Sequence, residues 1–260
     1  MRPAPREIQS VARAGSLLQA FTKADEWSTS ALARDVKLHK SVVHRLLVTL
    51  MRSGILVQDP ATDLFRLGPL MASLGRRAER SSNLLRMARP ILEDLRDKSG
   101  ETVSLCVLQG DRGLCLDVVE SAQSMRFTVQ PGDSFPAHAG CIGKVVLAFQ
   151  PPDMVARVLR KRPLERYTEK TITDPRTLRA ELSSIREREL GFSDGEITPG
   201  ARSVGAPVFD ADGKAIASIV VSAPTVRMTD EGLPRFLAIV AAAAKQLSGE
   251  LGFVPARSAA

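Results

Sequence analysis

The sequence contains few of the residues that form disulfide bonds or bind structural metal ions. Only 3 of its 260 residues are cysteine and only 3 are histidine. An odd number of cysteines at irregular spacing does not indicate a disulfide framework, and no paired Cys-X-X-Cys knuckle is present to hold zinc. Cys106 and Cys115 fall in strand-like runs, where a buried thiol acts as a small apolar side chain. We therefore expect neither a metal nor another cofactor.

Long apolar runs are also absent. No stretch reaches the ~18 residues of a membrane-spanning helix, and the basic first residues are not followed by the apolar segment of a secretory signal. The composition, 44% hydrophobic and 25% charged, is ordinary for a globular protein. These features predict a cytoplasmic protein of two domains that makes no contact with a membrane.

Positive charge is present in excess, and it is concentrated in the first third of the chain. Residues 1–80 hold 13 Lys and Arg against 7 Asp and Glu, whereas residues 81–260 hold 23 against 22. Nearly all of the formal net charge of +7 therefore belongs to the N-terminal part. This asymmetry indicates a polyanionic partner such as DNA, whose phosphates lysine and arginine neutralise.

Residues 28–52 have the pattern of two short amphipathic helices around a three-residue turn. The apolar positions of the second helix follow the i, i+3, i+4, i+7 spacing of a core-facing stripe: Val43, Leu46, Leu47 and Leu50. The opposite face is polar and basic and carries Ser41, Arg45, Val48 and Arg52, flanked by His44 and Thr49. This arrangement is typical of a helix-turn-helix, whose second helix enters the major groove. Alternatively, Arg45 and Arg52 only solvate a surface helix.

The segments on either side complete a DNA-binding domain. Upstream, an apolar stripe predicts a third helix with Val11, Ala14, Leu18 and Phe21 on its buried face. Downstream, residues 53–68 have two strand-like runs around an Asp-Pro-Ala-Thr-Asp turn, the pattern of a β-hairpin wing. We therefore predict a winged helix-turn-helix domain over residues 1–68 that binds double-stranded DNA.

The rest of the chain predicts a linker and a larger domain. Residues 69–83 have the apolar spacing of a linker helix that begins at a proline. From residue 84 to 256 we predict one domain, in which a helix over 84–98 precedes two hairpins at 102–120 and 203–222. Further helices are predicted at 141–149, 152–161, 175–190 and 230–247. Hairpins interleaved with helices favour an α+β fold, an antiparallel sheet covered by helices.

Several segments resemble the IclR family of bacterial transcriptional regulators, namely residues 8–14, 40–47, 54–75, 131–144, 191–210 and 220–224. The resemblance covers about residues 8–250, nearly the whole chain. It implies a winged helix-turn-helix joined by a linker helix to a GAF-like effector-binding domain. It also implies a regulator, repressor or activator, whose C-terminal domain binds a small metabolite, expected to be an organic acid. Such a protein is not an enzyme, and it acts as a homodimer or a dimer of dimers on a pseudo-palindromic operator.

The helix positions define the expected DNA contacts. The full set is Lys40, Ser41, Val42, His44, Arg45, Arg52 and Arg66. The first two residues, at the start of the second helix, are placed for phosphates, while Ser41, His44 and Arg45 are placed for base edges. Val42 is expected to touch a thymine methyl, or else to pack at the flank of the helix. Arg66 is the expected wing contact, because Asp59 and Asp63 at the wing tip disfavour phosphate.

The resemblance also suggests where the effector binds: at a strand around Met125 and Phe127, at the helix start with Cys141 and Ile142, at the loop acid Glu196, and at the strand residues Pro207, Val220 and Ser222. Backbone amides at the start of the 141–149 helix favour a carboxylate there. Family members that bind small polar acids tend to offer a hydroxyl and a thiol where this chain has Val220 and Pro207, so we expect a more apolar pocket. In the DNA-binding part, Lys37 replaces the usual glycine of the turn.

Two other functions fit parts of the sequence. A thiol- or serine-dependent hydrolase would use Cys141 with His138, or Ser222, as its nucleophile, but no nucleophile elbow or acid–base pairing accompanies them. His138 and Cys141 stand three residues apart and could ligate a metal, although a second pair of ligands is absent. An architectural DNA-binding protein without a ligand is disfavoured by the nearly uncharged C-terminal part.

Overall fold

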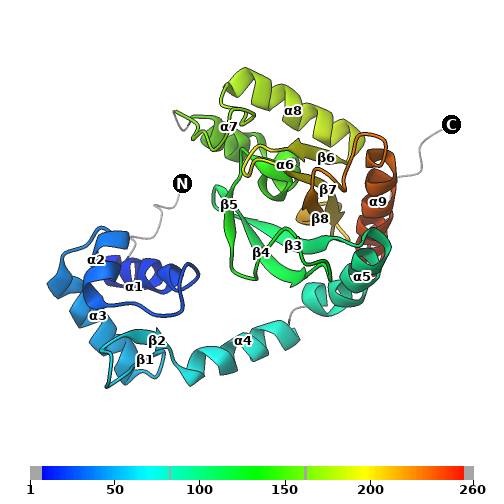
Figure 1. Cartoon of the computed structure of the whole chain (residues 1–260). Coiled ribbons are helices and arrows are strands. Elements are labelled where there is room, and N and C mark those ends of the chain that lie inside the picture. Colours follow the sequence, from blue (N-terminus) through cyan, green and yellow to red (C-terminus); the bar gives the residue numbers. More distant parts are fainter. Residues whose placement is uncertain (1–7, 82, 161–162, 255–260) are drawn as a thin grey trace. The chain divides into compact units, whose positions relative to one another are not determined.

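The computed structural model describes residues 8–81, 83–160 and 163–254, which form two compact units divided between residues 82 and 83 (Figure 1). Of the predicted segments, residues 1–7, 82, 161 and 255–256 lie outside the described residues. The predicted domain limits at residues 68, 83 and 256 stay predictions.

The first unit is a winged helix-turn-helix, as predicted. Its helices are α1 (Gln9–Ala20), α2 (Thr29–Asp35) and α3 (Lys40–Arg52), followed by strands β1 (Leu56–Gln58) and β2 (Phe65–Leu67) and by α4 (Pro69–Ser81). Strands β1 and β2 pair antiparallel and form the wing. Ser28 caps α2 by accepting a hydrogen bond from the Ala31 amide. Lys37, in the turn before α3, has φ +53°, the left-handed conformation for which glycine is the usual residue.

The apolar stripe predicted for α3 is confirmed, whereas the stripe predicted for α1 is partly wrong. Val43, Leu47 and Leu50 of α3 are buried in the core of the unit. On α1, Val11 is 65% exposed, and Leu17 and Ala20 are buried instead, next to Phe21. A helix turns by about 100° per residue, so a one-residue error in register moves the buried face to a neighbouring side.

The second unit is built on one antiparallel sheet of strand order β5-β4-β3-β8-β7-β6. The bounds are β3 (Thr102–Gln109), β4 (Arg112–Val119), β5 (Ser134–Pro136), β6 (Gly191–Asp194), β7 (Ala201–Phe209) and β8 (Ala215–Pro224). The two predicted hairpins are confirmed as β3/β4 and β7/β8. The two edge strands, β5 and β6, were not predicted. The expected strand around Met125 and Phe127 is wrong, because residues 120–133 are irregular.

Helices cover both faces of this sheet (Figure 1). Helices α5 (Asn83–Ser99) and α9 (Leu233–Glu250) pack together on one face over the first apolar core. Helices α6 (Gly140–Ala148), α7 (Pro152–Arg160) and α8 (Pro175–Arg188) form the second core on the other. Every residue of α6 is buried, as expected for a helix that is apolar apart from Lys144. None of the described helices is long and apolar enough to cross a membrane.

Candidate functional sites

The outer face of α3 presents the residues predicted to contact DNA. Lys40, Ser41, His44, Arg45 and Arg52 are exposed, and Val42 is half-buried. Within the described parts of the chain, none of the three cations among them forms an ion pair. At the start of the helix the imidazole Nδ1 of His39 lies 2.8 Å from the Ser41 hydroxyl, which orients that hydroxyl. This face therefore offers free positive charge and hydrogen-bonding groups on one side of a helix.

On the wing, Arg66 already has acidic partners. Its guanidinium lies 3.2 Å from the Asp59 carboxylate and 3.6 Å from that of Glu26. A phosphate would have to compete with both carboxylates for this side chain. Sequence reasoning also missed Trp27, whose backbone exchanges two hydrogen bonds with Phe65 at 3.0 and 2.8 Å. This bridge fastens the wing to the segment before α2.

Five of the eight residues predicted to contact an effector surround one small cavity of about 30 Å³ in the second unit. They are Phe127, Cys141, Ile142, Glu196 and Ser222. Lining residues that the prediction missed are Phe135, Gly140, Ser193, Ile197, Thr198, Ala201, Arg202 and Ser203. Several of these residues belong to the edge strand β6 and the loop after it. Neither segment has a sequence pattern strong enough to predict it.

The other three predicted residues lie elsewhere. Met125 is 58% exposed on the irregular segment after β4. Pro207 is buried on β7, four residues beyond Ser203, which places it roughly 13 Å farther along the strand. Val220 is fully buried beneath α6, in the second core. Pro207 and Val220 were placed by resemblance alone, and the strand register puts Ser203 opposite Ser222 instead.

A buried ion network forms the polar end of the cavity. Lys144, on the second turn of α6, has a side chain only 1% exposed, and its Nζ lies 2.5 Å from Glu196 and 3.0 Å from Glu181. Burial opposes the positive charge, but the two carboxylates outweigh it, so the pKa of Lys144 lies above its ordinary value. Sequence reasoning missed Lys144, although a single charge inside an otherwise apolar helix is a signal for a buried ion pair.

Glu196 also caps α6 from outside the helix. Ala139, the residue before α6, has no side chain that can cap it, and the Gly140 amide donates instead to Glu196 Oε2 at 3.1 Å. The carbonyl oxygen of Glu196 accepts a 2.6 Å hydrogen bond from the Thr171 hydroxyl, which holds this loop in place. A side-chain carboxylate therefore already occupies the helix start, where the sequence predicted that an anion would be favoured.

Other donors at this end of the cavity are unused. Among the described residues, the amides of Cys141 and Ile142 have no hydrogen-bond partner, and neither do the hydroxyls of Ser193 and Ser222. Ser193 and Ser222 are only 5% and 4% exposed, and both line the cavity. Because buried polar groups are normally hydrogen-bonded, this cluster is suited to a polar ligand.

A wider depression adjoins the cavity. The depression has a volume of about 540 Å³ and shares three lining residues with the cavity, namely Phe127, Phe135 and Thr198. A cavity of about 30 Å³ holds little more than water. A larger ligand must therefore move these side chains, and the depression is the approach that such movement would open.

The thiol and imidazole considered for catalysis have separate partners. The Cys141 thiol donates to the Ser203 carbonyl at 3.2 Å, and burial raises its pKa to about 12. The His138 Nε2 lies 2.9 Å from the carbonyl oxygen of Glu165. A thiol of this kind is almost entirely protonated at neutral pH and is a poor nucleophile.

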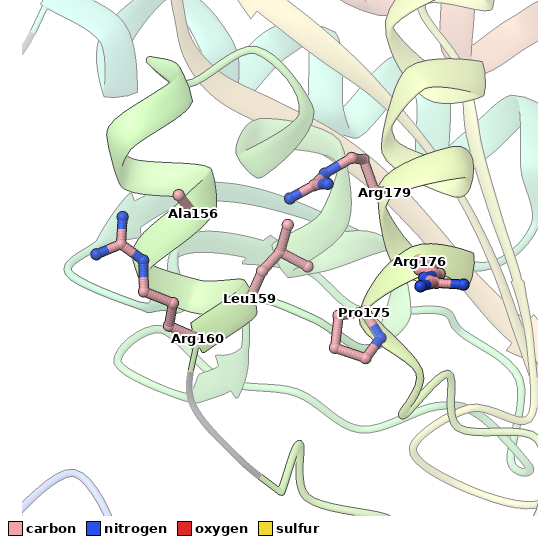
Figure 2. A pocket seen from close by; sticks show the side chains of 6 residues that line it. All are labelled: Ala156, Leu159, Arg160, Pro175, Arg176 and Arg179. Atoms are coloured by element: carbon pink, nitrogen blue, oxygen red, sulfur yellow. The ribbon is translucent and has the colours of Figure 1, made fainter.

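A second cleft, of about 340 Å³, lies between α7 and α8 (Figure 2). Arg179 extends from α8 toward Leu159 of α7, and Arg160 and Arg176 also line the cleft. All three arginines are exposed, so solvent and salt screen their attraction for an anion. The smaller cavity at α6 has the buried polar groups that this cleft lacks.

Comparison with known proteins gives matches over nearly the whole chain. Residues 10–60 match the IclR helix-turn-helix domain, and residues 77–249 match the C-terminal domain of bacterial transcriptional regulator IclR. The chain is 37% identical over 252 residues to the transcriptional regulator BhcR of Paracoccus denitrificans, covering 97% of this chain and 90% of that protein. It is 32% identical to the transcriptional repressor IclR of Escherichia coli, covering 95% and 91%.

Solved structures agree with these matches. An IclR transcriptional regulator from Alicyclobacillus acidocaldarius superposes with a TM-score of 0.84 at 27% identity, covering 95% of this chain and 100% of that one. An IclR homologue from Microbacterium hydrocarbonoxydans, crystallised with 4-hydroxybenzoate, gives a TM-score of 0.78 at 26% identity, covering 93% and 98%.

Proposed function

The chain belongs to the IclR family of bacterial transcriptional regulators, and we propose that a small organic acid entering the cavity at the start of α6 controls how tightly α3 binds an operator. The observation that supports this most directly is the set of unused donors, the Cys141 and Ile142 amides and the Ser193 and Ser222 hydroxyls, beside the aromatic wall of the cavity. Helix-start amides favour a carboxylate, and aromatic walls favour an apolar body.

The likeness to the homologue crystallised with 4-hydroxybenzoate supports an aromatic acid as the effector class. The acid binds one of two states that differ in DNA affinity and shifts the population toward it. Cys141 has no catalytic part in this mechanism, because its thiol is protonated and hydrogen-bonded. We place the protein in the cytoplasm, with the DNA it binds.

On DNA, we propose that α3 lies in the major groove, with Arg45 and His44 at base edges and Lys40 and Arg52 at phosphates. One α3 covers one half-site, so a dimer or a dimer of dimers reads a pseudo-palindromic operator. Exposed apolar side chains on two helices of the first unit support self-association. They are Ile8 and Val11, at the start of α1, and Leu70 and Leu74 on α4, each between 39% and 67% exposed.

The test is fluorescence anisotropy with labelled DNA from upstream of the protein's own gene and with scrambled DNA of equal length, over a series of salt concentrations. We expect selective binding to upstream DNA, a steep loss of affinity with salt, and a change in affinity when an acid from a panel is added. The panel holds acetate, pyruvate, benzoate and 4-hydroxybenzoate, each with its neutral amide. Absence of selectivity on genomic fragments would refute the DNA part, and no response to any acid would refute the effector part.

A further inference from the structure

Glu196 occupies the place that a ligand carboxylate would need. We infer that Glu196 is a built-in substitute for the effector, so that the acid binds by replacing the Glu196 carboxylate at the start of α6 rather than by joining it. This inference rests on the proposed acid effector and adds how the site discriminates and opens. Its first support is geometric, because the Gly140 amide and the Lys144 ammonium both bond the Glu196 carboxylate, at 3.1 and 2.5 Å.

The charges around Lys144 favour exchange over addition. Its single ammonium already has two carboxylate partners, Glu196 and Glu181. Arg202, which lines the cavity, lies 3.1 Å from Asp194 and 2.7 Å from Asp230 and is therefore neutralised as well. A third buried carboxylate at Lys144 would have no counter-charge, and like charges in close contact are strongly unfavourable. Exchange leaves the net charge of the buried site unchanged.

The available volume leads to the same conclusion. A cavity of about 30 Å³ cannot hold an organic acid together with the Glu196 side chain. Departure of that side chain vacates the helix start itself. The loop that carries it runs between Gly195 and Gly200, both at positive φ, and includes Ile197 and Thr198 of the cavity wall. Replacement of Glu196 by the acid therefore also moves the part of the cavity wall through which the acid enters.

The experiment compares Glu196→Gln with Glu181→Gln. Both variants remove one negative charge from the same ammonium, but Glu181 neither lines the cavity nor bonds the Gly140 amide. Affinities for each acid and its amide are measured by isothermal titration calorimetry on the full chain. Under exchange, Glu196→Gln binds the acids at least about tenfold more tightly, whereas Glu181→Gln stays within about threefold of the wild type. The amides should gain less than the acids in Glu196→Gln, because they bring no negative charge to Lys144.

Four results would overturn the inference. Equal gains in both variants would mean that simple charge removal explains the effect. Weaker acid binding by Glu196→Gln would mean that Glu196 contacts the ligand directly. If the wild type binds an acid but Glu196→Gln gains nothing, exchange is wrong while the acid effector stands, and if neither binds any acid, the proposed effector class fails as well.

A measurement on the wild type keeps the inference testable if a variant does not fold. A crystal structure with the tightest-binding acid of the panel should place a ligand oxygen at the Gly140 amide and the Glu196 carboxylate away from it. A complex in which Glu196 still accepts the Gly140 hydrogen bond would refute exchange.

Discussion

Replacing Lys144 by methionine should lower the free energy of unfolding of the second unit substantially. Methionine has nearly the length of lysine but no charge, so Glu196, whose side chain is 7% exposed, loses its ammonium partner while remaining buried. Removing one partner of a buried ion pair costs about 3–5 kcal/mol. A typical domain has only about 5–15 kcal/mol of stability, so the effect is large enough to measure by denaturation.

The matched control is Lys170→Met. Lys170 also pairs with a carboxylate, Asp194 at 2.7 Å, but its side chain is 62% exposed. Exposed ion pairs contribute about 0–1 kcal/mol, so the same substitution should have a small effect there. The difference between the two variants therefore reports burial of the charge rather than loss of a lysine.

Urea unfolding is followed by circular dichroism for the whole chain and by tryptophan fluorescence for the first unit. The chain's single tryptophan, Trp27, belongs to the first unit, so its transition should keep its midpoint in Lys144→Met. Adding Glu181→Gln and Glu196→Gln to Lys144→Met should restore part of the lost stability, because no buried charge then lacks a partner. A loss below about 1 kcal/mol, or one equal to that of Lys170→Met, would refute the argument.

Three further outcomes are expected. In anisotropy assays, Arg45→Ala should weaken binding to the operator by about 1–3 kcal/mol more than binding to scrambled DNA. Arg66→Ala should change both affinities little, because Arg66 is already ion-paired. Equal loss of affinity for both DNAs in Arg45→Ala would make Arg45 a phosphate contact. In urea unfolding, Gly143→Ala should destabilise the protein by more than about 2 kcal/mol, because the new Cβ would lie 2.4 Å from the Pro136 carbonyl oxygen. Gly249→Ala, whose Cβ meets nothing within 4 Å in helix α9, should stabilise it by about 0.5–1 kcal/mol. Effects of the same sign would contradict the close approach at α6. Hydrogen bonds from Lys170 and Arg202 lower the pKa of Asp194. The contribution of Asp194 to the free energy of unfolding is therefore present above its unfolded pKa near 3.9 and is lost as the pH falls through the lower folded value. The difference in melting temperature between wild type and Asp194→Asn should shrink from pH 6 to pH 2, and a constant difference would contradict this.

The features that sequence predicted are those set by local periodicity. The buried stripe of α3 follows from four apolar residues at helical spacing, and both long hairpins follow from alternating runs around turn residues. Lys37 was noted as a departure from glycine, and its positive φ explains why glycine is usual at that place. The short edge strands were missed because three or four residues carry too little pattern to separate a strand from a loop.

The polar end of the cavity could be predicted only in part, because it is made by tertiary contacts. Glu196 and Gly140 are 56 residues apart, and nothing local to either indicates that a carboxylate will cap that helix. The sequence did predict that the helix start favours an anion, and the protein's own side chain meets that preference. Pro207 and Val220 do not line the cavity, because the resemblance assigns a strand, whereas the register between β7 and β8 decides which of its residues face the cavity.

The central pairing of the sheet has a consequence for synthesis of the protein. Strands β3 and β8 are neighbours, and Ser104 pairs with Val220, 116 residues later in the chain. At the ribosome's rate of about 5–20 residues per second, β8 is made roughly 6–23 s after β3. During that interval the hairpin of β3 and β4 has an unpaired apolar edge, which is a template for association with another nascent chain. Substitutions that weaken β8 should therefore reduce the yield of folded protein made in the cell more than they reduce the stability of the finished domain.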